Sequence, residues 1–452
     1  MKMTVGEIAG ACGGELLCGD PDTVITSVST DSRKVGPGIL FVPIKGERTD
    51  AHNFIDAVFA AGASASLTQE HSRMDDSHAW IRVTDTVAAL QRIASAYRER
   101  FRIPFIGITG SVGKTTTKEM IALALSAQLK VMKTEGNFNS QIGLPLTMFR
   151  LTGEHEAAVI EMGMSNFGEM ERLAQIAAPD YAVVTNIGIS HIEQLKTQQN
   201  IRREKLHITD RFHKGSVLFL NGDDELLAEL RGKLDTKIVC FGTKPWCDFR
   251  AENIEFEAGS TVFTLLTPET SAKVRIPALG MHNVTNALAG LAVAHTLGVP
   301  LSGAIEKLAE YKPLAMRQQI HSVNGMTVID DSYNASPDSI RSSVDVLCSF
   351  HSGKRVAVLA DMLELGELSQ QAHNNVGVYA AQAGVDVLIT VGERAEQIAK
   401  GAQSVKPDFT SHVCKGNEEA IAKLKSLLTF GDAVLVKGSR GMHTDQIVKA
   451  LL

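Results

Sequence analysis

Closely paired cysteines are missing from this sequence. No CxxC pair occurs, and the six cysteines are spread along the chain: Cys12, Cys18, Cys240, Cys247, Cys348 and Cys414. Structural zinc sites and disulfide-stapled folds use closely spaced cysteines. We therefore expect reduced, buried thiols, and the spacing leaves a Cys12–Cys18 pair as the alternative.

Long apolar runs are also missing. No stretch reaches the roughly 18 uninterrupted apolar residues of a membrane-spanning helix, and residues 1–20 have neither the basic start nor the apolar core of a signal peptide. The net charge of -6 argues against a nucleic-acid partner. These absences predict a cytoplasmic protein that does not insert into a membrane.

The length of 452 residues exceeds what one hydrophobic core usually supports, so about two to four domains are expected. Hydrophobic content of 44% and charged content of 21% are typical of a globular protein. No short repeat and no low-complexity tract interrupts the chain. The patterns described next predict an α/β protein of three domains, 1–98, 99–313 and 314–452.

The three segments differ in their patterns of apolar residues. Residues 1–98 suggest a small α/β domain of short, mixed elements. Later, apolar β-rich runs alternate with helical periodicity, as in parallel βαβ units. The strands expected in the central, P-loop ATPase-like sheet are 103–108, 157–162, 181–187 and 216–220, followed by a β-rich patch at 261–279 and a helix at 282–297. The strands expected in the C-terminal, Rossmann-like sheet are 326–331, 354–362, 385–392 and 432–439.

The stretch "GITGSVGKTTTKE" joins the first central strand to an amphipathic helix. Strand, glycine-rich turn and helix is the context in which backbone N–H groups and a lysine hold phosphate. The motif is GxxGKT, shorter than the common GxxxxGK[ST], and the alternative is a glycine turn before an exposed lysine. The predicted phosphate loop consists of Gly110, Ser111, Val112, Gly113, Lys114, Thr115 and Thr116, with Thr115 placed to coordinate Mg²⁺.

Two polar residues close neighbouring central strands. Glu161 ends "AAVIE", and burying an unpaired carboxylate there would cost several kcal/mol. His191 follows the next strand in the same way. Because metal ligands of nucleotide sites gather at the carboxyl ends of parallel strands, we interpret both as Mg²⁺ ligands. A surface acid and a structural histidine are the alternatives.

These motifs resemble the Mur ligases of peptidoglycan synthesis, a family of ATP-dependent ligases that also includes folylpolyglutamate synthetase. The resemblance covers essentially the whole chain. It rests on seven motifs in order: "TGSVGKTTTKE", "EGNFNSQIGLPLT", "VIEMGM", "NIGISHIE", "GMHNVTNALAG", "DDSYNASPDS" and "LVKGSRGM".

Within the family, "DSYN" and the N-terminal "TDSRKVGPGILFVPIKGER" are similar to the members that add a dipeptide. The resemblance implies ATP-dependent joining of D-alanyl-D-alanine to UDP-N-acetylmuramoyl-tripeptide through an acyl phosphate, giving the pentapeptide, ADP and phosphate. It also implies a monomer. It does not tell whether the third residue of the acceptor is lysine or diaminopimelate.

The family resemblance also implies the catalytic residues. Positive charge for the transferred phosphoryl group would come from Lys114, Arg317 and two Mg²⁺ ions. A carbamylated Lys205 would join Glu161 and His191 in one metal site, and Thr115 would hold the other metal. The chain departs from the family pattern at His207, where glutamate is common, and at Met316, where glycine is usual.

The remaining residues are assigned by resemblance alone. Asn283 and Asn286 would meet adenine, although helix capping also explains them, and Asp331 would bind the ribose. The acceptor peptide and the dipeptide would face Asn137, Asn139, Tyr333, Asn334 and Lys437. The UDP end would contact Asp31, Ser32, Arg33, Gly46 and His52, although on residue types this stretch also fits a charged surface hairpin.

Two other functions remain open from the residues. A ligase that adds a single amino acid to another nucleotide-linked or folate substrate would share the loop, although folate ligases generally begin near it. A nucleotide-dependent regulatory protein would use the loop as a switch and hydrolyse ATP without any amine. Hydrolysis that requires both acceptor and dipeptide distinguishes the dipeptide ligase from both.

Overall fold

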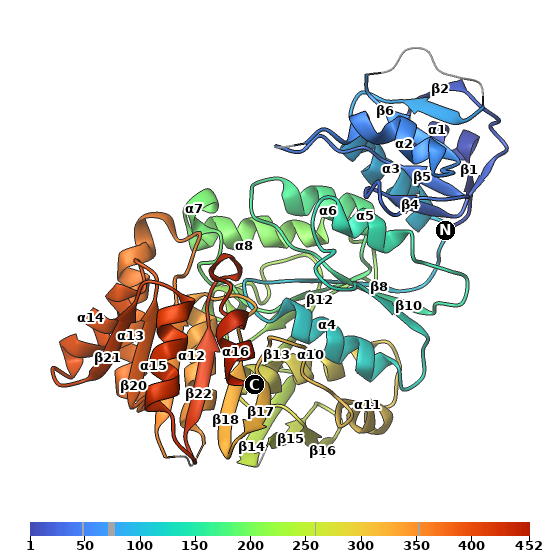
Figure 1. Cartoon of the computed structure of the whole chain (residues 1–452). Coiled ribbons are helices and arrows are strands. Elements are labelled where there is room, and N and C mark those ends of the chain that lie inside the picture. Colours follow the sequence, from blue (N-terminus) through green and yellow to red (C-terminus); the bar gives the residue numbers. More distant parts are fainter. Residues whose placement is uncertain (48, 71–76, 258, 351–352) are drawn as a thin grey trace.

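The computed structural model describes residues 1–47, 49–70, 77–257, 259–350 and 353–452. Three large sheets of five, nine and six strands occur in chain order. Figure 1 shows the N-terminal part, in blue, at one end of the molecule, while the central and C-terminal parts together form the other end. None of the described helices is both long and apolar enough to cross a membrane.

The N-terminal sheet has the order β2-β7-β6-β5-β4, with β4 to β7 parallel and β2 antiparallel. Its strands are β2 (Glu15–Cys18), β4 (Ser27–Ser29), β5 (Ile39–Phe41), β6 (Ala65–Thr68) and β7 (Ala79–Arg82), and β1 (Met3–Thr4) pairs with β3 (Val24–Ile25). The helices are α1 (Val5–Cys12), η1 (Ala51–Phe54), α2 (Ile55–Ala60) and α3 (Thr86–Arg98). Thr4 and Glu7 form a capping box at the start of α1, which satisfies two of its free N–H groups.

The central sheet has the order β16-β15-β14-β13-β12-β11-β8-β10-β9. It is parallel from β9 to β14, and only β15 and β16 are antiparallel. Its strands are β8 (Phe105–Thr109), β9 (Val131–Lys133), β10 (Ala157–Glu161), β11 (Tyr181–Val184), β12 (Val217–Asn221), β13 (Lys237–Gly242), β14 (Phe249–Glu257), β15 (Ser260–Leu266) and β16 (Ser271–Ile276).

Helices cover both faces of this sheet, so its parallel strands are apolar throughout. On one face Ile106 and Val159 pack with α4 (Lys114–Leu125), α10 (Met281–Thr296) and α11 (Leu301–Leu308). On the other face a core continuous with the N-terminal one includes α3 and α6 (Glu169–Ala177). The other central helices are α5 (Gly143–Met148), α7 (Ile192–Leu195), α8 (Gln198–Leu206), η2 (His207–Thr209) and α9 (Glu225–Ala228).

The C-terminal sheet has the order β17-β18-β22-β19-β20-β21 and is parallel except for β17. Its strands are β17 (Gln319–Val323), β18 (Met326–Asp330), β19 (Arg355–Ala360), β20 (Val387–Val391), β21 (Thr410–Cys414) and β22 (Ala433–Lys437). One face packs α12 (Pro337–Cys348), α13 (Ser369–Ala383) and α14 (Glu396–Val405), and the other α15 (Asn417–Leu427) and α16 (Asp445–Leu451). The short helices η3 (Gly366–Leu368) and η4 (Arg440–Met442) lie in loops.

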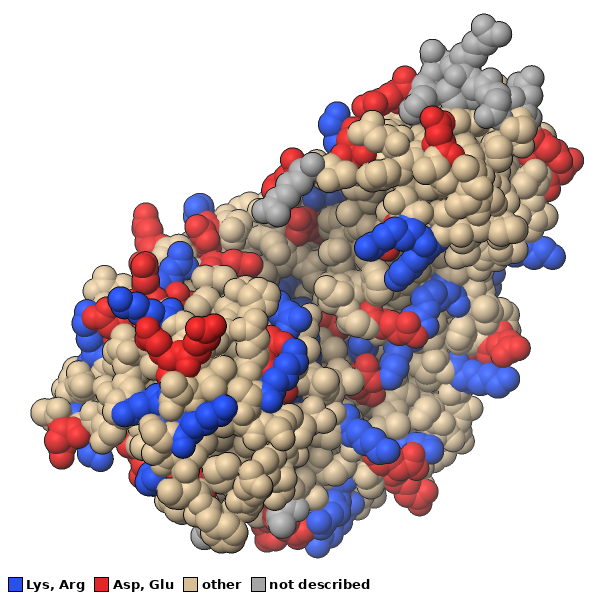
Figure 2. Space-filling view, in the orientation of Figure 1, with Lys and Arg blue, Asp and Glu red and all other residues tan. Residues whose placement is uncertain are grey.

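The predicted fold class is confirmed: the chain is α/β with mostly parallel central and C-terminal sheets. None of the six cysteines, all of which lie in the described part of the chain, forms a disulfide, and Cys18 and Cys348 are only partly buried. Figure 2 shows acidic and basic side chains interspersed over one face of the molecule, without a large patch of one sign.

Candidate active site

The phosphate-type loop connects β8 to α4 and depends on two glycines. Gly110 has φ 149°, and a Cβ there would lie 1.8 Å from Thr185 Oγ1. Gly113, at φ 86°, caps the start of α4. The glycines therefore let the backbone turn at the positive end of a 12-residue helix.

The segment after β11 holds this loop in shape. The backbone N–H of Val112 donates to Asn186 Oδ1 at 2.8 Å, and that of Ser111 to the Asn186 carbonyl at 3.1 Å. Lys114 Nζ lies over the loop and donates to the Gly110 carbonyl at 2.7 Å. Burial lowers the pKa of Lys114, and the nearby Glu161 carboxylate opposes that shift.

Glu161 ends β10 beside the loop and is only 2% exposed. Its Oε1 accepts hydrogen bonds from Thr115 Oγ1 at 3.1 Å and from Asn139 Nδ2 at 2.8 Å. Its Oε2 is buried without a hydrogen bond among the described residues, and Lys118 Nζ lies 3.9 Å away. A buried carboxylate oxygen with no donor, next to a threonine hydroxyl, fits the oxygen ligands that Mg²⁺ prefers.

His191 adopts a left-handed backbone conformation, φ 62°, just before α7. Its Nδ1 lies 2.6 Å from Oε2 of Glu364, a residue in the loop that follows β19 of the C-terminal sheet. The close contact with the His191 ring lowers the pKa of Glu364. Glu364 was not singled out in the sequence, because no local pattern links it to His191.

Lys205, on α8, is 2% exposed and has no hydrogen-bond or ion-pair partner among the residues that the structure describes. Burial, and then the positive charge of Lys114, lower its pKa well below the usual range for lysine. His207, the departure from the family pattern, bonds Asp210 at 2.9 Å. Arg203 is exposed on the same helix.

Asp331 and Lys437 follow or end neighbouring parallel strands of the C-terminal sheet, β18 and β22. Their side chains form a buried ion pair. Asp331 also accepts hydrogen bonds from Ser343 Oγ at 2.6 Å and from the Gln318 N–H at 3.2 Å. This network holds the Asp331 carboxylate in one orientation at the edge of the sheet.

Arg317 stacks on Tyr333, with its guanidinium carbon 4.0 Å from the ring centroid. The preceding Met316 has φ 60°, a conformation that favours glycine. The departure from the family's glycine therefore keeps the backbone turn that places Arg317. The Met316 carbonyl accepts a hydrogen bond from the Tyr333 N–H at 3.1 Å.

Asn283 and Asn286, on the first turns of α10, are bonded within the chain. Asn286 Oδ1 accepts from Thr117 Oγ1 at 2.8 Å, and Asn283 Nδ2 donates to the Leu279 carbonyl at 2.8 Å. The first bond ties α10 to the helix of the phosphate-type loop. Neither asparagine caps α10, whose N-cap is Gly280.

A cleft of about 980 Å³ opens where the central and C-terminal sheets meet. It brings together seventeen of the residues singled out in the sequence: Ser111, Val112, Gly113, Lys114, Thr115, Thr116, Asn137, Asn139, Glu161, His191, Asn283, Asn286, Arg317, Asp331, Tyr333, Asn334 and Lys437. Glu364, Gln318, Tyr311 and His282 also line it and were not predicted. Gly110 and Lys205 lie outside its lining, as do the five N-terminal candidates.

Comparisons with known proteins show which family the chain resembles. The family model for the Mur ligase middle domain matches residues 108–294, that for the Mur ligase glutamate ligase domain 316–440, and that for the Mur ligase family catalytic domain 24–98. The UDP-N-acetylmuramoyl-tripeptide–D-alanyl-D-alanine ligase of Bacillus subtilis is 38% identical, over 100% of this chain and 99% of the relative. The Escherichia coli ligase of the same name is 34% identical, over 100% and 98%.

Solved structures give the same result. A crystal structure of MurF from Acinetobacter baumannii superimposes with a TM-score of 0.93, at 32% identity and over 100% and 99% of the two chains. MurF ligase from Thermotoga maritima, in complex with ADP, gives 0.85 at 29% identity, over 94% and 96%. The chain belongs to the Mur ligase family. Like the rest of that family, it is an ATP-dependent ligase.

In this Mur ligase the N-terminal candidates lie at the carboxyl edge of the first sheet. Asp31, Ser32 and Arg33 follow β4, and Gly46 follows the parallel β5. Arg33 is 86% exposed at its side chain and bonds Asp31, which lowers the pKa of that carboxyl to about 2. The Gly46 N–H donates to the Thr49 carbonyl at 3.0 Å.

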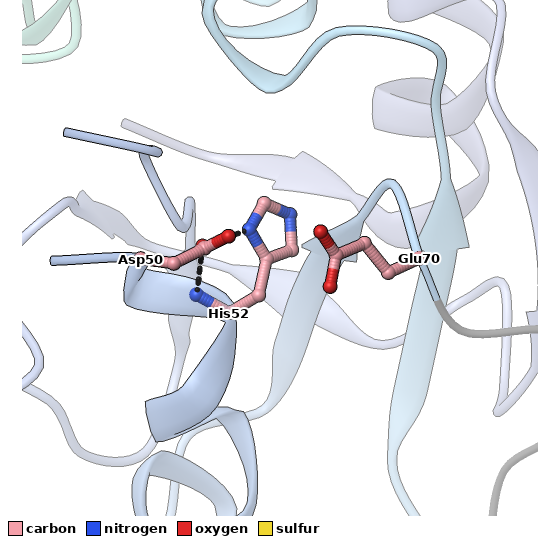
Figure 3. Close-up of side chains that lie close together, drawn as sticks. All are labelled: Asp50, His52 and Glu70. Atoms are coloured by element: carbon pink, nitrogen blue, oxygen red, sulfur yellow. Dashed lines mark hydrogen bonds and ion pairs between the residues drawn. The ribbon is translucent and has the colours of Figure 1, made fainter. Parts of the chain in front are cut away.

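His52, the last N-terminal candidate of this Mur ligase, is buried between Asp50 and Glu70 (Figure 3). Its Nδ1 bonds Asp50 at 2.7 Å, and its Nε2 accepts from the Gln69 N–H at 3.4 Å. Lys45 Nζ lies 3.5 Å from Asp50 and 3.7 Å from Glu70. Because both ring nitrogens are engaged and a lysine already supplies positive charge, this cluster does not fit a metal ion.

Proposed function

We propose that this Mur ligase joins D-alanyl-D-alanine to the terminal carboxylate of UDP-N-acetylmuramoyl-tripeptide. Full-length relatives at 38% and 34% identity carry that activity in their names. The observation that carries the proposal is the shared cleft, in which Lys114 of the central sheet and Tyr333, Asn334 and Lys437 of the C-terminal part line one space. A nucleotide loop opposite polar groups of a second sheet suits a reaction between ATP and two further substrates.

The first step is transfer of the γ-phosphoryl group of ATP to the acceptor carboxylate, which gives an acyl phosphate and ADP. Two anions approach each other in this step, so the site must supply concentrated positive charge. Lys114 has this role at the loop. Arg317, held by its stacking on Tyr333, supplies a second cation from the C-terminal side.

Mg²⁺ fits the oxygen-rich end of the cleft. Glu161 offers its unbonded Oε2, Thr115 offers a hydroxyl, and His191 offers the ring nitrogen that Glu364 does not engage. A bound Mg²⁺ supplies charge neutralisation and polarisation of the phosphoryl oxygens. We propose two metal positions, one served by Thr115 with the phosphates and one by Glu161, His191 and a modified Lys205.

The proposed modification is a carbamate on Lys205. A neutral amine adds CO₂ with loss of one proton, so the lowered pKa of Lys205 favours the reaction at neutral pH. The product is an anion, which gives Lys114 a neighbour of opposite charge in place of a buried amine. Carbamylation thereby improves the balance of charge around Lys205.

The second step is attack by the free amine of D-alanyl-D-alanine on the acyl phosphate. A tetrahedral intermediate forms, one proton leaves the nitrogen, and collapse expels phosphate as the amide forms. Tyr333, Asn334 and Lys437 face the peptide or the dipeptide in this assignment, with Asn137 and Asn139 near the muramoyl-peptide. Because acyl phosphates hydrolyse, closure of the cleft also serves to exclude water.

The binding sites for ATP and for the UDP end of the acceptor are assigned to separate parts of the chain. Asn283 and Asn286 contact adenine, and Asp331 accepts hydrogen bonds from the ribose. The carboxyl edge of the N-terminal sheet binds the UDP end through residues 31–33, Gly46 and His52. In this assignment, domain 1–98 binds the UDP end, domain 99–313 binds ATP, and domain 314–452 completes the ligase site. The enzyme is a monomer and works in the cytoplasm, where ATP is available.

Phosphate release tests this function directly. Enzyme, ATP and Mg²⁺ are mixed with UDP-N-acetylmuramoyl-tripeptide, carrying either lysine or diaminopimelate, with and without D-alanyl-D-alanine. We expect release only when acceptor and dipeptide are both present, and loss of about 100-fold or more in Lys114→Ala. Release that ignores the dipeptide would contradict the assignment, and release with a single amino acid would favour the other type of ligase.

A further inference from the structure

The strongest unassigned feature is the contact between the loop after β19 and the segment after β11. We propose that Glu364 is a positioning residue: delivered from the C-terminal sheet, it fixes the imidazole of His191 for metal binding. The inference rests on the proposed role of His191 and deepens it. It makes assembly of the metal site depend on contact between the two sheets.

The loop that carries Glu364 is anchored on both sides. The Met362 N–H donates to His373 Nε2 at 2.9 Å, and the Leu363 N–H donates to Ser439 Oγ at 3.0 Å. Leu365 is 2% exposed in the C-terminal core. Glu364 itself has φ 64°, so the backbone turns sharply between these anchors. The Glu364 carboxylate therefore extends from a loop whose backbone is held by hydrogen bonds and by the buried Leu365.

The receiving segment is in direct contact with this loop. A Cβ at Gly366 would lie 3.2 Å from Glu193 Cγ, which shows how closely the two backbones approach. His191 turns toward the loop with φ 62°, and its Nδ1 meets Glu364 Oε2 at 2.6 Å. Backbone conformation on both sides thus brings the two groups together.

The chemistry of the pair is that of a metal-ligating histidine. Such histidines usually donate the other ring N–H to a carboxylate, which fixes the tautomer and raises the basicity of the ligating nitrogen. With Nδ1 of His191 in ion-pair contact with Glu364 at 2.6 Å, Nε2 is the ring nitrogen that remains for a metal. No other carboxylate bonds His191 among the described residues.

The same segment also supports the phosphate-type loop. Asn186 bonds the N–H groups of Ser111 and Val112, and the Gly188 N–H donates to Ser111 Oγ at 2.9 Å. A single stretch after β11 therefore carries the loop at one end and His191 at the other. Glu364 ties this stretch to the C-terminal sheet.

A purely structural salt bridge predicts a different result. The Glu364 side chain is 56% exposed, and exposed pairs contribute little to stability. Removing Glu364 should then leave both the melting temperature and the metal affinity nearly unchanged. A positioning role predicts instead that metal affinity falls while stability is kept.

Mn²⁺ binding, followed by electron paramagnetic resonance with Mn²⁺ in place of Mg²⁺, separates the two roles. The variants are Glu364→Ala and Glu364→Gln, with His191→Ala to define the signal of this site. The matched control is Glu367→Ala, an exposed acid in the same loop without a hydrogen bond or ion pair among the described residues. Affinity is measured with and without ADP, and melting temperatures are recorded for all variants.

We expect Glu364→Ala to weaken Mn²⁺ binding about 10- to 100-fold. Glu364→Gln should recover much of the affinity, because its amide oxygen can occupy the place of the carboxylate oxygen beside Nδ1, and Glu367→Ala should match the wild type. Affinity within twofold of the wild type in a folded Glu364→Ala protein would overturn the proposal, as would a glutamine variant no better than alanine. The assay uses neither acceptor nor dipeptide, so it can succeed even if the proposed substrates are wrong.

Discussion

At the scale of single residues, Lys205 shows how burial changes the meaning of a side chain. The charged stretch "RREK" predicts an exposed helix. The structure instead leaves Lys205 only 2% exposed, close enough to Lys114 for that charge to lower its pKa. We predict that Lys205→Ala loses about 100-fold or more of the ligase rate, because a metal ligand is removed. Acetate or propionate should restore part of the rate by placing a carboxylate in the vacated space.

Two measurements make that prediction specific. Arg203→Ala, an exposed neighbour on α8, should keep full activity. In carbon-13 spectra recorded with labelled bicarbonate, a carbamate resonance should appear for the wild type and not for Lys205→Ala. A fully active Lys205→Ala enzyme would remove the carbamate from the mechanism.

Residues differ in how far the sequence predicts them. Lys114 and Glu161 could be singled out because a loop motif and a strand end mark where their side chains meet. The partner of His191 could not be found, since Glu364 lies in a loop of another sheet and no local pattern links the two. The same holds for the burial of Lys205, which depends on how α8 packs.

At the scale of elements, the positions of the strands along the chain were predictable, and the order of the strands within each sheet was not. The run 157–162 differs from β10 by one residue at one end, and the run 216–220 differs from β12 by one residue at each end. Buried parallel strands give continuous apolar runs, which explains this agreement. The order of the strands depends on pairings between distant segments, so the sequence could not show that β14 to β16 extend the same central sheet.

Two glycines set how closely helices α13 and α14 pack. A Cβ at Gly377 would lie 1.8 Å from the Ile398 carbonyl oxygen, and one at Gly401 would lie 2.0 Å from that of Asn374. Gly401→Ala must therefore push the helices apart, at a cost of about 1–3 kcal/mol. We expect a lower apparent melting temperature by calorimetry.

The matched control for this helix pair is Gly10→Ala. Gly10 is exposed in α1 with nothing within 4 Å of an added Cβ, so alanine should stabilise that helix by about 0.5–1 kcal/mol. An unchanged melting temperature for Gly401→Ala would mean that the helices can separate without cost.

At the scale of the whole molecule, the cleft is lined by residues of the central and C-terminal parts. Figure 1 shows the N-terminal sheet at one end of the molecule. None of the residues that line the cleft comes from the N-terminal sheet. A ligand in the cleft raises the free energy of every local opening that would release it, by about 2.7 kcal/mol at 100 times its Kd. The segments whose hydrogen exchange slows when the ligand is added are the segments that hold it.

Hydrogen exchange with Mg²⁺ and ADP measures that distribution. We expect slower exchange both at 110–117, around the loop and the start of α4, and at 331–343, which carries Asp331 and the start of α12. Residues 29–47 should exchange as in the free protein until UDP-N-acetylmuramoyl-tripeptide is added, because they lie outside the cleft. Protection confined to 110–117 would mean that the nucleotide does not bridge the two sheets, and Asp331 would then lose its proposed contact with the ribose.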